Sequence, residues 1–292
     1  MTPAQSIPRA RTIEWQVAGA CNYDCSYCIQ SREYRRGRPR REQLERAIAT
    51  FAELPGAWEI KCSGGEAFAH PLFMAYVVPE LMARTPHRIS VLTNFSATHA
   101  ELMEFARQTR GRLAVFSASL HLESVSAEEF ATKAAWFQML LDEDTRFVVN
   151  QVVLPGREDE AARCRAVIEG RGLRWFPQLY KVDGGVAEYP SPAALIPLVG
   201  RRPTSREANV APSYRGKLCW AGVDYFVVDK DGDAWACRTA KRYGEGALGN
   251  AFDGSLARAL APQPCAYDIC PCTVPANRGM IEGVTGGAEV FE

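Results

Sequence analysis

The sequence predicts an α/β fold with a parallel sheet, followed by a smaller cysteine-rich region. Two observations support this: β-rich runs alternate with longer helical runs from Thr12 to about Leu179, and most cysteines lie in two groups, one near each end. The expected strands are Ile13–Val17, Trp58–Cys62, Arg88–Thr93, Leu113–Leu120, Arg146–Val153 and Leu173–Leu179. The expected helices are Glu42–Leu54, Leu72–Arg84, Ala97–Thr109, Ala127–Leu141 and Asp159–Glu169. Strands that alternate with helices form right-handed crossovers, which place catalytic groups at the carboxyl ends of the strands.

The helices are expected because their apolar residues recur at helical spacing, as in Leu44, Ile48 and Phe51. Residues 180–217 lack such a pattern and contain five prolines, which indicates a long connection over an active site. The run Tyr225–Cys237 predicts a β-hairpin that turns at Asp231-Gly232. We therefore expect a catalytic domain over residues 1–180, a connection over 181–218 and a small C-terminal domain over 219–292.

The composition is that of an ordinary soluble protein. Of the 292 residues, 47% are hydrophobic and 23% are charged, and 34 basic residues balance 34 acidic ones. This balance gives no field that would attract nucleic acid or an anionic membrane. No apolar run approaches the roughly 18 residues that span a bilayer, and residues 1–11 are too polar for a secretory signal. We expect a cytoplasmic protein, whose ten cysteines do not form disulfides and whose clustered cysteines bind metal or take part in chemistry.

Three cysteines follow the first expected strand at the spacing C-x3-C-x2-C, namely Cys21, Cys25 and Cys28. Iron–sulfur clusters prefer thiolate ligands, and a [4Fe–4S] cluster normally takes four of them. A loop with three thiolates leaves one iron open for a small molecule, just as a catalytic zinc keeps one position open. The alternatives are a zinc knuckle that lacks its histidine and a chance spacing.

This triad resembles the motif of the radical S-adenosylmethionine superfamily, C-x3-C-x-aromatic-C, with Tyr27 in the aromatic position. The resemblance covers about Thr12 to Leu179 and implies a partial (β/α)6, TIM-like barrel. It implies that the triad binds a [4Fe–4S] cluster, that the open iron binds the methionine part of S-adenosylmethionine, and that Tyr27 lies against the adenine. An electron from the cluster then yields a 5′-deoxyadenosyl radical, which abstracts a substrate hydrogen.

A second motif agrees with this resemblance. Ser63-Gly64-Gly65-Glu66 follows the second strand, where the family has a Gly-Gly-Glu that meets the methionine ammonium. Glycines permit close backbone approach, and a carboxylate complements a cation. Thr93-Asn94 resembles the family's Thr-Asn-Gly, with Phe95 in place of the glycine. The further candidates for the cofactor site are Asn94, Ser117, Ser119 and Asn150; the alternative for each is that it caps the end of a strand.

The second group of cysteines resembles an auxiliary-cluster module, called SPASM or, in its shorter form, Twitch. Cys219 and Cys237 frame Gly232 at the spacing with which such modules open, and a later loop adds Cys265, Cys270 and Cys272. One [4Fe–4S] cluster takes four thiolates and two take eight, so five thiols favour one auxiliary cluster and the shorter module. The spacing C-x4-C-x-C departs from that of the long module, which leaves the choice of four ligands open. A structural zinc site is the alternative.

Cys62 ends the second strand just before the glycines. A thiol there would be placed to give a hydrogen atom to a substrate radical, as in epimerases that the chain resembles; the alternative is a small buried strand residue. His121 follows the fourth strand and either touches the site or has a structural role. Six arginines between Arg32 and Arg41 either reach an anionic substrate or form a solvated loop.

The resemblance implies an oxidoreductase or isomerase with a catalytic and an auxiliary cluster, the second of which would take an electron from a substrate radical. We expect dehydrogenation or epimerisation of a small natural product, such as a sugar or cyclitol. The reason is that about a dozen residues precede the first strand, too few for a peptide-recognition domain. The alternatives are modification of a ribosomal peptide or protein and, outside enzymes, a two-cluster electron-transfer protein. The expected partners are the substrate and a reductant such as flavodoxin or ferredoxin.

Overall fold

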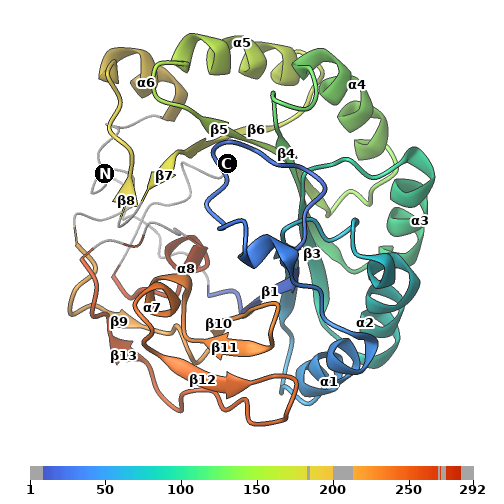
Figure 1. The fold of residues 1–292 in the computed structure, drawn as a ribbon, viewed down its shortest axis with the longest axis vertical. Helices are drawn as coiled ribbons and strands as arrows, with labels where there is room; N and C mark the ends of the chain where they lie inside the picture. Colours follow the sequence, from blue (N-terminus) through green and yellow to red (C-terminus); the bar gives the residue numbers. More distant parts are fainter. Residues whose placement is uncertain (1–8, 183–184, 200–212, 269, 271–273, 284–292) are drawn as a thin grey trace.

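The computed structural model describes residues 9–182, 185–199, 213–268, 270 and 274–283. A curved sheet with the strand order β12-β11-β10-β1-β2-β3-β4-β5-β6 runs through it, and strands β1 to β6 are parallel. These strands are β1 (Thr12–Ala18), β2 (Glu59–Gly64), β3 (Arg88–Thr93), β4 (Leu113–Leu120), β5 (Arg146–Val153) and β6 (Trp175–Leu179). The loop after β1, with the short helix η1 (Tyr34–Arg36), lies inside the arc that they form (Figure 1).

Helices cover the outside of this arc (Figure 1). They are α1 (Arg41–Ala52), α2 (Val78–Arg84), α3 (His99–Thr109), α4 (Ala127–Gln138) and α5 (Glu158–Glu169). Together with the strands they confirm the α/β fold and the partial barrel that the sequence predicts. One predicted helix differs, because a π-helical turn, η2 (Phe73–Val77), precedes α2. Pro79 has no N–H to donate to the Ala75 carbonyl, and Val78 instead donates to the Phe73 carbonyl.

The strands β1 to β6 present one face to the helices and the other to the inside of the arc. Trp15, Cys62 and Val91 are neighbours across β1, β2 and β3, and all three are fully buried in the apolar core under the helices. Glu14 and the residues beside it on β2 and β3 belong to the opposite face and line a cavity. The inner face of the sheet is therefore the polar one, because successive side chains of a strand alternate between faces.

The predicted hairpin in the C-terminal region is confirmed. Strands β10 (Tyr225–Val228) and β11 (Asp233–Trp235) pair antiparallel, and Gly232 in the turn has a φ of 87°. This hairpin does not form a sheet of its own. It pairs in parallel with β1, in a register that joins Thr12 to Tyr225, and β12 (Ala247–Asn250) continues the sheet beyond β11. The predicted boundary at residue 219 therefore does not separate two sheets.

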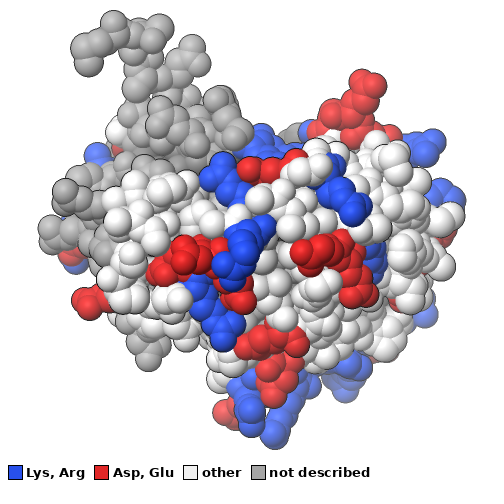
Figure 2. Space-filling view, turned by 90° about the horizontal axis from the view of Figure 1, so that it is seen from above, with Lys and Arg blue, Asp and Glu red and all other residues white. Residues whose placement is uncertain are grey.

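Smaller elements complete the described chain. The predicted connection contains the short antiparallel pair β7 (Lys181–Val182) and β8 (Gly185–Val186) and the helix α6 (Pro192–Val199). The C-terminal region adds the strand pair β9 (Leu218–Cys219) and β13 (Gln263–Pro264) and the helices α7 (Arg238–Arg242) and α8 (Val274–Asn277). None of the helices in the described ranges combines the length and apolar character needed to cross a membrane. Acidic and basic side chains are interspersed on the face seen in Figure 2.

Candidate active site

A cavity of about 480 Å³ lies against the inner face of the sheet. All three cysteines of the N-terminal triad line it, at the carboxyl end of β1. Among the residues that the sequence assigned to the cofactor site, those that also line the cavity are Tyr27, Gly64, Gly65, Asn94, Ser117, Ser119 and Asn150. Residues far apart in the sequence are thus brought to one space by the parallel strands, as expected for this type of sheet.

The three thiols of the triad affect one another. Burial raises the pKa of Cys25 to about 11, and the charges of Cys21 and Cys28 add to this rise. Burial likewise raises the pKa of Cys21, which accepts hydrogen bonds from the Tyr23 N–H (3.4 Å) and the Asn94 amide (3.8 Å). Three thiolates that repel one another are stabilised together by a cationic cluster, so this donor set fits an iron–sulfur cluster.

No three cysteine, histidine or acidic side chains in the described part of the chain converge on one metal ion. A cubane cluster does not require such convergence, because each thiolate binds a different iron.

The loop that carries the triad is held by the segment that follows β4. The Nδ1 atom of His121 lies 2.9 Å from the Tyr27 hydroxyl and 3.4 Å from the Cys25 sulfur. The Tyr27 ring stacks on the His121 ring at a centroid distance of 5.8 Å. Glu123 accepts hydrogen bonds from both the N–H (2.9 Å) and the hydroxyl of Ser26. His121 therefore contacts the site, and Glu123 is a positioning residue that the sequence motifs did not indicate.

The two glycines after β2 pack directly against the chain that leads into the triad. The Gly65 N–H donates to the Ala18 carbonyl (2.7 Å), and the Glu66 N–H donates to the Ala20 carbonyl (2.9 Å). A Cβ atom on Gly64 or Gly65 would overlap the carbonyl oxygens of residues 18 to 20. Gly64 also has a φ of 135°, which side chains disfavour. The glycines are thus needed for the close packing that sets the position of the cysteine loop.

Glu66 does not line the cavity. Its carboxylate is fully buried and accepts hydrogen bonds from the Thr93 hydroxyl (2.7 Å), the Asn94 N–H (2.6 Å) and the Phe68 N–H (3.0 Å). Burial raises its pKa to about 6, although these hydrogen bonds oppose the rise. The resemblance implied a contact between Glu66 and the cofactor ammonium. In the structure the carboxylate instead joins the end of β2 to the end of β3 and orients Asn94, which does face the cavity.

Phe95 occupies the position of the glycine in the motif that this segment resembles, and its backbone is left-handed, with a φ of 62°. The Thr93 hydroxyl accepts its N–H (2.9 Å), and its carbonyl accepts from the Lys133 ammonium (2.8 Å). The ring is buried against Phe116, Phe130, Phe137 and Phe147. Aromatic packing therefore holds a turn that a glycine would adopt without strain.

A row of polar side chains crosses the inner face from β4 to β6. The Asn150 amide donates to the Ser117 hydroxyl (2.5 Å), and the Gln178 amide lies 3.4 Å from the Asn150 carbonyl oxygen. Ser119 is the neighbour of Asn150 in the register of β4 and β5. Gln178, which the sequence did not indicate, completes the row. Hydroxyl and amide groups in this arrangement suit the hydroxyls of a ribose or another polar ligand.

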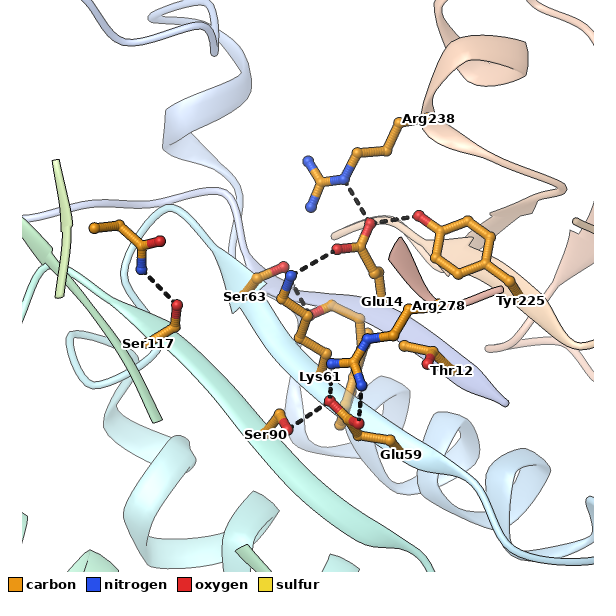
Figure 3. A network of polar contacts seen from close by, with 12 residues as sticks. Thr12, Glu14, Glu59, Lys61, Ser63, Ser90, Ser117, Tyr225, Arg238 and Arg278 are labelled. Carbon is orange, nitrogen blue, oxygen red and sulfur yellow. Dashed lines mark hydrogen bonds and ion pairs between the residues drawn. The ribbon is translucent and has the colours of Figure 1, made fainter. Parts of the chain in front are cut away.

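A buried ionic network joins the C-terminal region to the barrel (Figure 3). Glu14 accepts hydrogen bonds from the Tyr225 hydroxyl (2.6 Å) and Arg238 (2.7 Å), and the Lys61 ammonium lies 3.1 Å away. Burial would raise the pKa of Glu14, but the charges of Arg238 and Lys61, together with these hydrogen bonds, hold it well below its usual range. Glu14 thus remains a carboxylate between two cations.

A second pair lies beside the first. The Arg278 guanidinium donates two hydrogen bonds of 2.6 Å to the two oxygens of Glu59, and the Ser90 hydroxyl donates a third of 2.6 Å. Together the two carboxylates bind α7 and the segment after α8 to the inner face of the barrel (Figure 3). No motif of the sequence indicated these contacts.

The cysteines of the C-terminal group that the structure describes lie near one another. Burial raises the pKa of Cys219 to about 12, and the charges of Cys265 and Cys237 contribute to the rise. Cys270 is buried in a small apolar cluster against which Cys219 and Cys265 pack. The Cys237 sulfur accepts the Ala240 N–H (3.3 Å) at the start of α7. The predicted ligand Cys272 lies outside the described residues.

Cys62 is placed on the helix-covered face of β2. It is fully buried between Trp15 and Val91, and it is not among the residues that line the cavity. Burial alone raises its pKa to about 12. This is the packed strand position that the sequence allowed as the alternative to a hydrogen-atom donor.

Comparison with known proteins agrees with this geometry. The model of the radical SAM superfamily matches residues 15–160. The chain belongs to this superfamily. Membership implies radical chemistry with S-adenosylmethionine and a [4Fe–4S] cluster. No curated protein sequence matches the chain.

Several solved structures of radical SAM enzymes share the fold. Polyhistidine-tagged anSMEcpe with bound AdoMet is 17% identical, with a TM-score of 0.58, over 84% of this chain and 78% of that chain. Native anSMEcpe with bound AdoMet and the Cp18Cys peptide is also 17% identical, with a TM-score of 0.57 over the same shares of both chains. SuiB of Streptococcus suis bound to its precursor peptide SuiA is 14% identical, with a TM-score of 0.60, over 86% of this chain and 64% of that chain.

Proposed function

We propose that this radical SAM enzyme dehydrogenates a small molecule, and that its C-terminal cysteines bind an auxiliary [4Fe–4S] cluster. The observation that carries the proposal is the composition of the cavity wall. The triad lines one part of it, and the C-terminal region contributes Arg238, Thr239, Arg242, Val274 and Arg278. A substrate in this cavity would lie between the triad and the C-terminal region that carries the second cysteine group.

The residues of this chain have distinct tasks in that reaction. The triad would hold the catalytic cluster, and Tyr27, Asn94, Ser117, Ser119 and Asn150 would contact S-adenosylmethionine. When bound, the catalytic cluster supplies the electron that splits S-adenosylmethionine into methionine and a 5′-deoxyadenosyl radical, and the auxiliary cluster supplies an acceptor for the second electron of the oxidation. The glycines after β2 and the buried Glu66 fix the loops on which these contacts depend.

The preference for a small substrate rests on the size of the cavity and on the segments that border it. The pairs Glu14–Arg238 and Glu59–Arg278 hold the C-terminal region across the inner face of the barrel. The remaining volume of about 480 Å³ is within the range of small-molecule sites, and it must also hold S-adenosylmethionine. These features favour a compact substrate over a long peptide.

Dehydrogenation is preferred to epimerisation because of the cysteines that the cavity contains. An epimerase needs a side chain that returns a hydrogen atom to the substrate radical, and Cys62 lies behind the sheet. Among the described residues, the cysteines that line the cavity are those of the triad, which are required as cluster ligands. A net oxidation needs no such donor.

Modification of a peptide is the second candidate. SuiB and anSMEcpe have both been solved with bound peptides, and they share this fold. Their sequence identity is low, so this likeness concerns the fold. A peptide substrate would place a single side chain in the cavity and the rest of its chain outside.

The first experiment is reduction of the anaerobically reconstituted protein with dithionite or with flavodoxin or ferredoxin. We expect formation of 5′-deoxyadenosine and about eight irons per chain. The variant Cys219→Ala should retain about four irons, while the buried Cys164→Ala, outside both groups, should retain all. A protein that holds eight irons without cleaving S-adenosylmethionine would be an electron-transfer protein, and zinc with little iron in the C-terminal region would indicate a structural zinc site. Either result would refute the proposal.

The type of reaction is tested in deuterated water. A dehydrogenase should release one oxidised product per cofactor cleaved, with no solvent deuterium at the attacked carbon. Deuterium at an inverted carbon would identify an epimerase instead. Activity on a peptide, with none on small polyols or acids, would favour the second candidate.

A further inference from the structure

The wall of the cavity is strongly basic. Seven of its lining side chains are basic and one is acidic, although the whole chain has 34 of each kind. The basic residues are Lys61, Arg146, Arg174, Lys181, Arg238, Arg242 and Arg278, and the acidic residue is Glu14. The mixed charge of the outer face in Figure 2 differs from this pattern. A cleft lined by one sign of charge concentrates ligands of the opposite sign.

Part of this charge has a structural use. Glu14 pairs with Lys61 and Arg238, and Glu59 pairs with Arg278. Arg238 and Arg278 hold the C-terminal region against the barrel, Lys61 shares Glu14 with Arg238, and both carboxylates are buried. They therefore explain the docking of the two parts, but they do not explain why further arginines line the same space.

Arg146 and Arg242 are not used in this way: among the described residues, neither side chain forms a hydrogen bond or an ion pair. Both are exposed and both line the cavity. Arg146 is the first residue of β5, and Arg242 is the last residue of α7, one turn after Arg238 on the same side of that helix. Each of the two main parts of the chain thus contributes one arginine that is available to a ligand.

Their position separates them from the cofactor residues. Arg146 shares the inner face of β5 with Asn150 and precedes it by four residues, which corresponds to about 13 Å along a strand. Asn150 and the cysteine triad belong to the carboxyl end of the sheet, where the cofactor is expected. S-Adenosylmethionine carries a sulfonium and an ammonium against one carboxylate, so it does not neutralise a basic wall.

We propose that the substrate carries an oxyanion, either a phosphate or a carboxylate, which Arg146 and Arg242 bind. This inference rests on the proposed function, which it makes more specific. The guanidinium group of arginine binds two oxygens of such an anion at once, and this geometry is why arginine is preferred to lysine for these ligands. The anion would anchor the substrate at the amino-terminal end of the strands and leave its carbon skeleton directed toward the cofactor.

The test is calorimetric titration of the reconstituted, S-adenosylmethionine-loaded enzyme with inorganic phosphate, with malonate and with uncharged glycerol. We expect saturable binding of at least one oxyanion, weakened by added sodium chloride, and none of glycerol. Arg146→Gln and Arg242→Gln should each weaken it about tenfold or more. Arg146→Lys, which keeps the charge and loses the paired hydrogen bonds, should have an intermediate affinity. The matched control is Arg171→Gln, an exposed arginine outside the cavity, which should bind like the unchanged enzyme.

Stronger binding of phosphate would indicate a phosphorylated substrate, and stronger binding of malonate would indicate a carboxylic acid. The inference is overturned if neither oxyanion binds, or if both glutamine variants, checked for folding by circular dichroism, bind as the unchanged enzyme does. Formation of 5′-deoxyadenosine is measured on the same unchanged preparation. Cofactor cleavage without oxyanion binding refutes this inference alone, whereas loss of cofactor cleavage refutes the proposed function.

Discussion

Replacement of Phe95 tests whether aromatic packing holds the strained turn beside the cofactor site. Its φ of 62° places a bulky residue in the left-handed region, and the residue is 3% exposed. The turn presents Asn94 to the cavity, so its conformation matters for the site. Two substitutions separate the ring from the backbone: Phe95→Ala removes the ring and keeps the strain, while Phe95→Gly removes both.

The expected magnitudes follow from these two features. Loss of a buried phenylalanine side chain costs about 3–5 kcal/mol, which is the full effect of Phe95→Ala. A left-handed backbone costs a residue other than glycine about 1–2 kcal/mol, and Phe95→Gly removes this cost. Glycine also makes the unfolded chain more flexible, which destabilises the folded state by about 0.5–1 kcal/mol and offsets part of the gain. Phe95→Gly should therefore be destabilised, but by about 1 kcal/mol less than Phe95→Ala.

The assay is urea unfolding of both variants, followed by circular dichroism. Phe130 provides the matched control, because its ring packs against Phe95 from the regular helix α4. There, glycine costs about 1 kcal/mol more than alanine. The order of the alanine and glycine variants should therefore be opposite at the two positions. If Phe95→Gly is no more stable than Phe95→Ala, the strain argument is wrong.

Three other predictions concern buried groups. Glu14→Gln should destabilise the protein by about 3–5 kcal/mol, because it leaves the cations Arg238 and Lys61 without their shared carboxylate. The control Glu45→Gln, on the exposed face of α1, should cost less than about 1 kcal/mol. The two variants are compared by their midpoints of unfolding in urea. Cys62→Ala should retain both cofactor cleavage and product formation, and should lose about 1 kcal/mol of stability. Loss of product formation with cofactor cleavage intact would instead show that Cys62 donates a hydrogen atom. Glu66 has a pKa of about 6 against an ordinary 4.5, so it binds a proton more tightly in the folded state. Its contribution to the free energy of unfolding is therefore complete below pH 4.5 and is lost as the pH rises to about 6. The stability of the cluster-free protein should fall by about 2 kcal/mol across this range, and Glu66→Gln should remove that slope.

The sequence was sufficient for the elements of the barrel and for the cysteine triad. Periodicity determines where strands and helices lie, and the expected strands Arg88–Thr93, Leu113–Leu120 and Arg146–Val153 have the same bounds in the structure. The triad was found because its spacing is local. The hairpin was found because Asp231-Gly232 lies between two β-rich runs, and Gly232 has the positive φ of such a turn.

The roles of single side chains near the strand ends were harder to predict. Cys62 and Ser63 are adjacent, yet one faces the helices and the other faces the cavity, because a strand alternates its side chains. Glu66 was expected to reach the cofactor because Gly64-Gly65-Glu66 resembles the family's Gly-Gly-Glu motif. In the structure the Glu66 carboxylate accepts hydrogen bonds from residues 68, 93 and 94. No local sequence pattern predicts these donors.

The ion pairs could not be predicted from the sequence, because their partners are far apart in the chain. Glu14 and Arg238 are 224 residues apart, and Glu59 and Arg278 are 219 apart. A single charged residue in a strand looks the same in the sequence whether it pairs with a distant arginine or faces solvent. Only the three-dimensional structure shows that the acidic residues on the inner face of β1 and β2 pair with arginines of the C-terminal region.

This arrangement links the closure of the cavity to the position of the C-terminal cysteines. Cys237 directly precedes Arg238 at the start of α7, and β10 leads into this region from its pairing with β1. A shift of α7 that broke the Glu14–Arg238 pair would therefore also move Cys237. An auxiliary cluster bound at these cysteines, as proposed above, would therefore depend for its position on the same ion pair that holds α7 against the barrel.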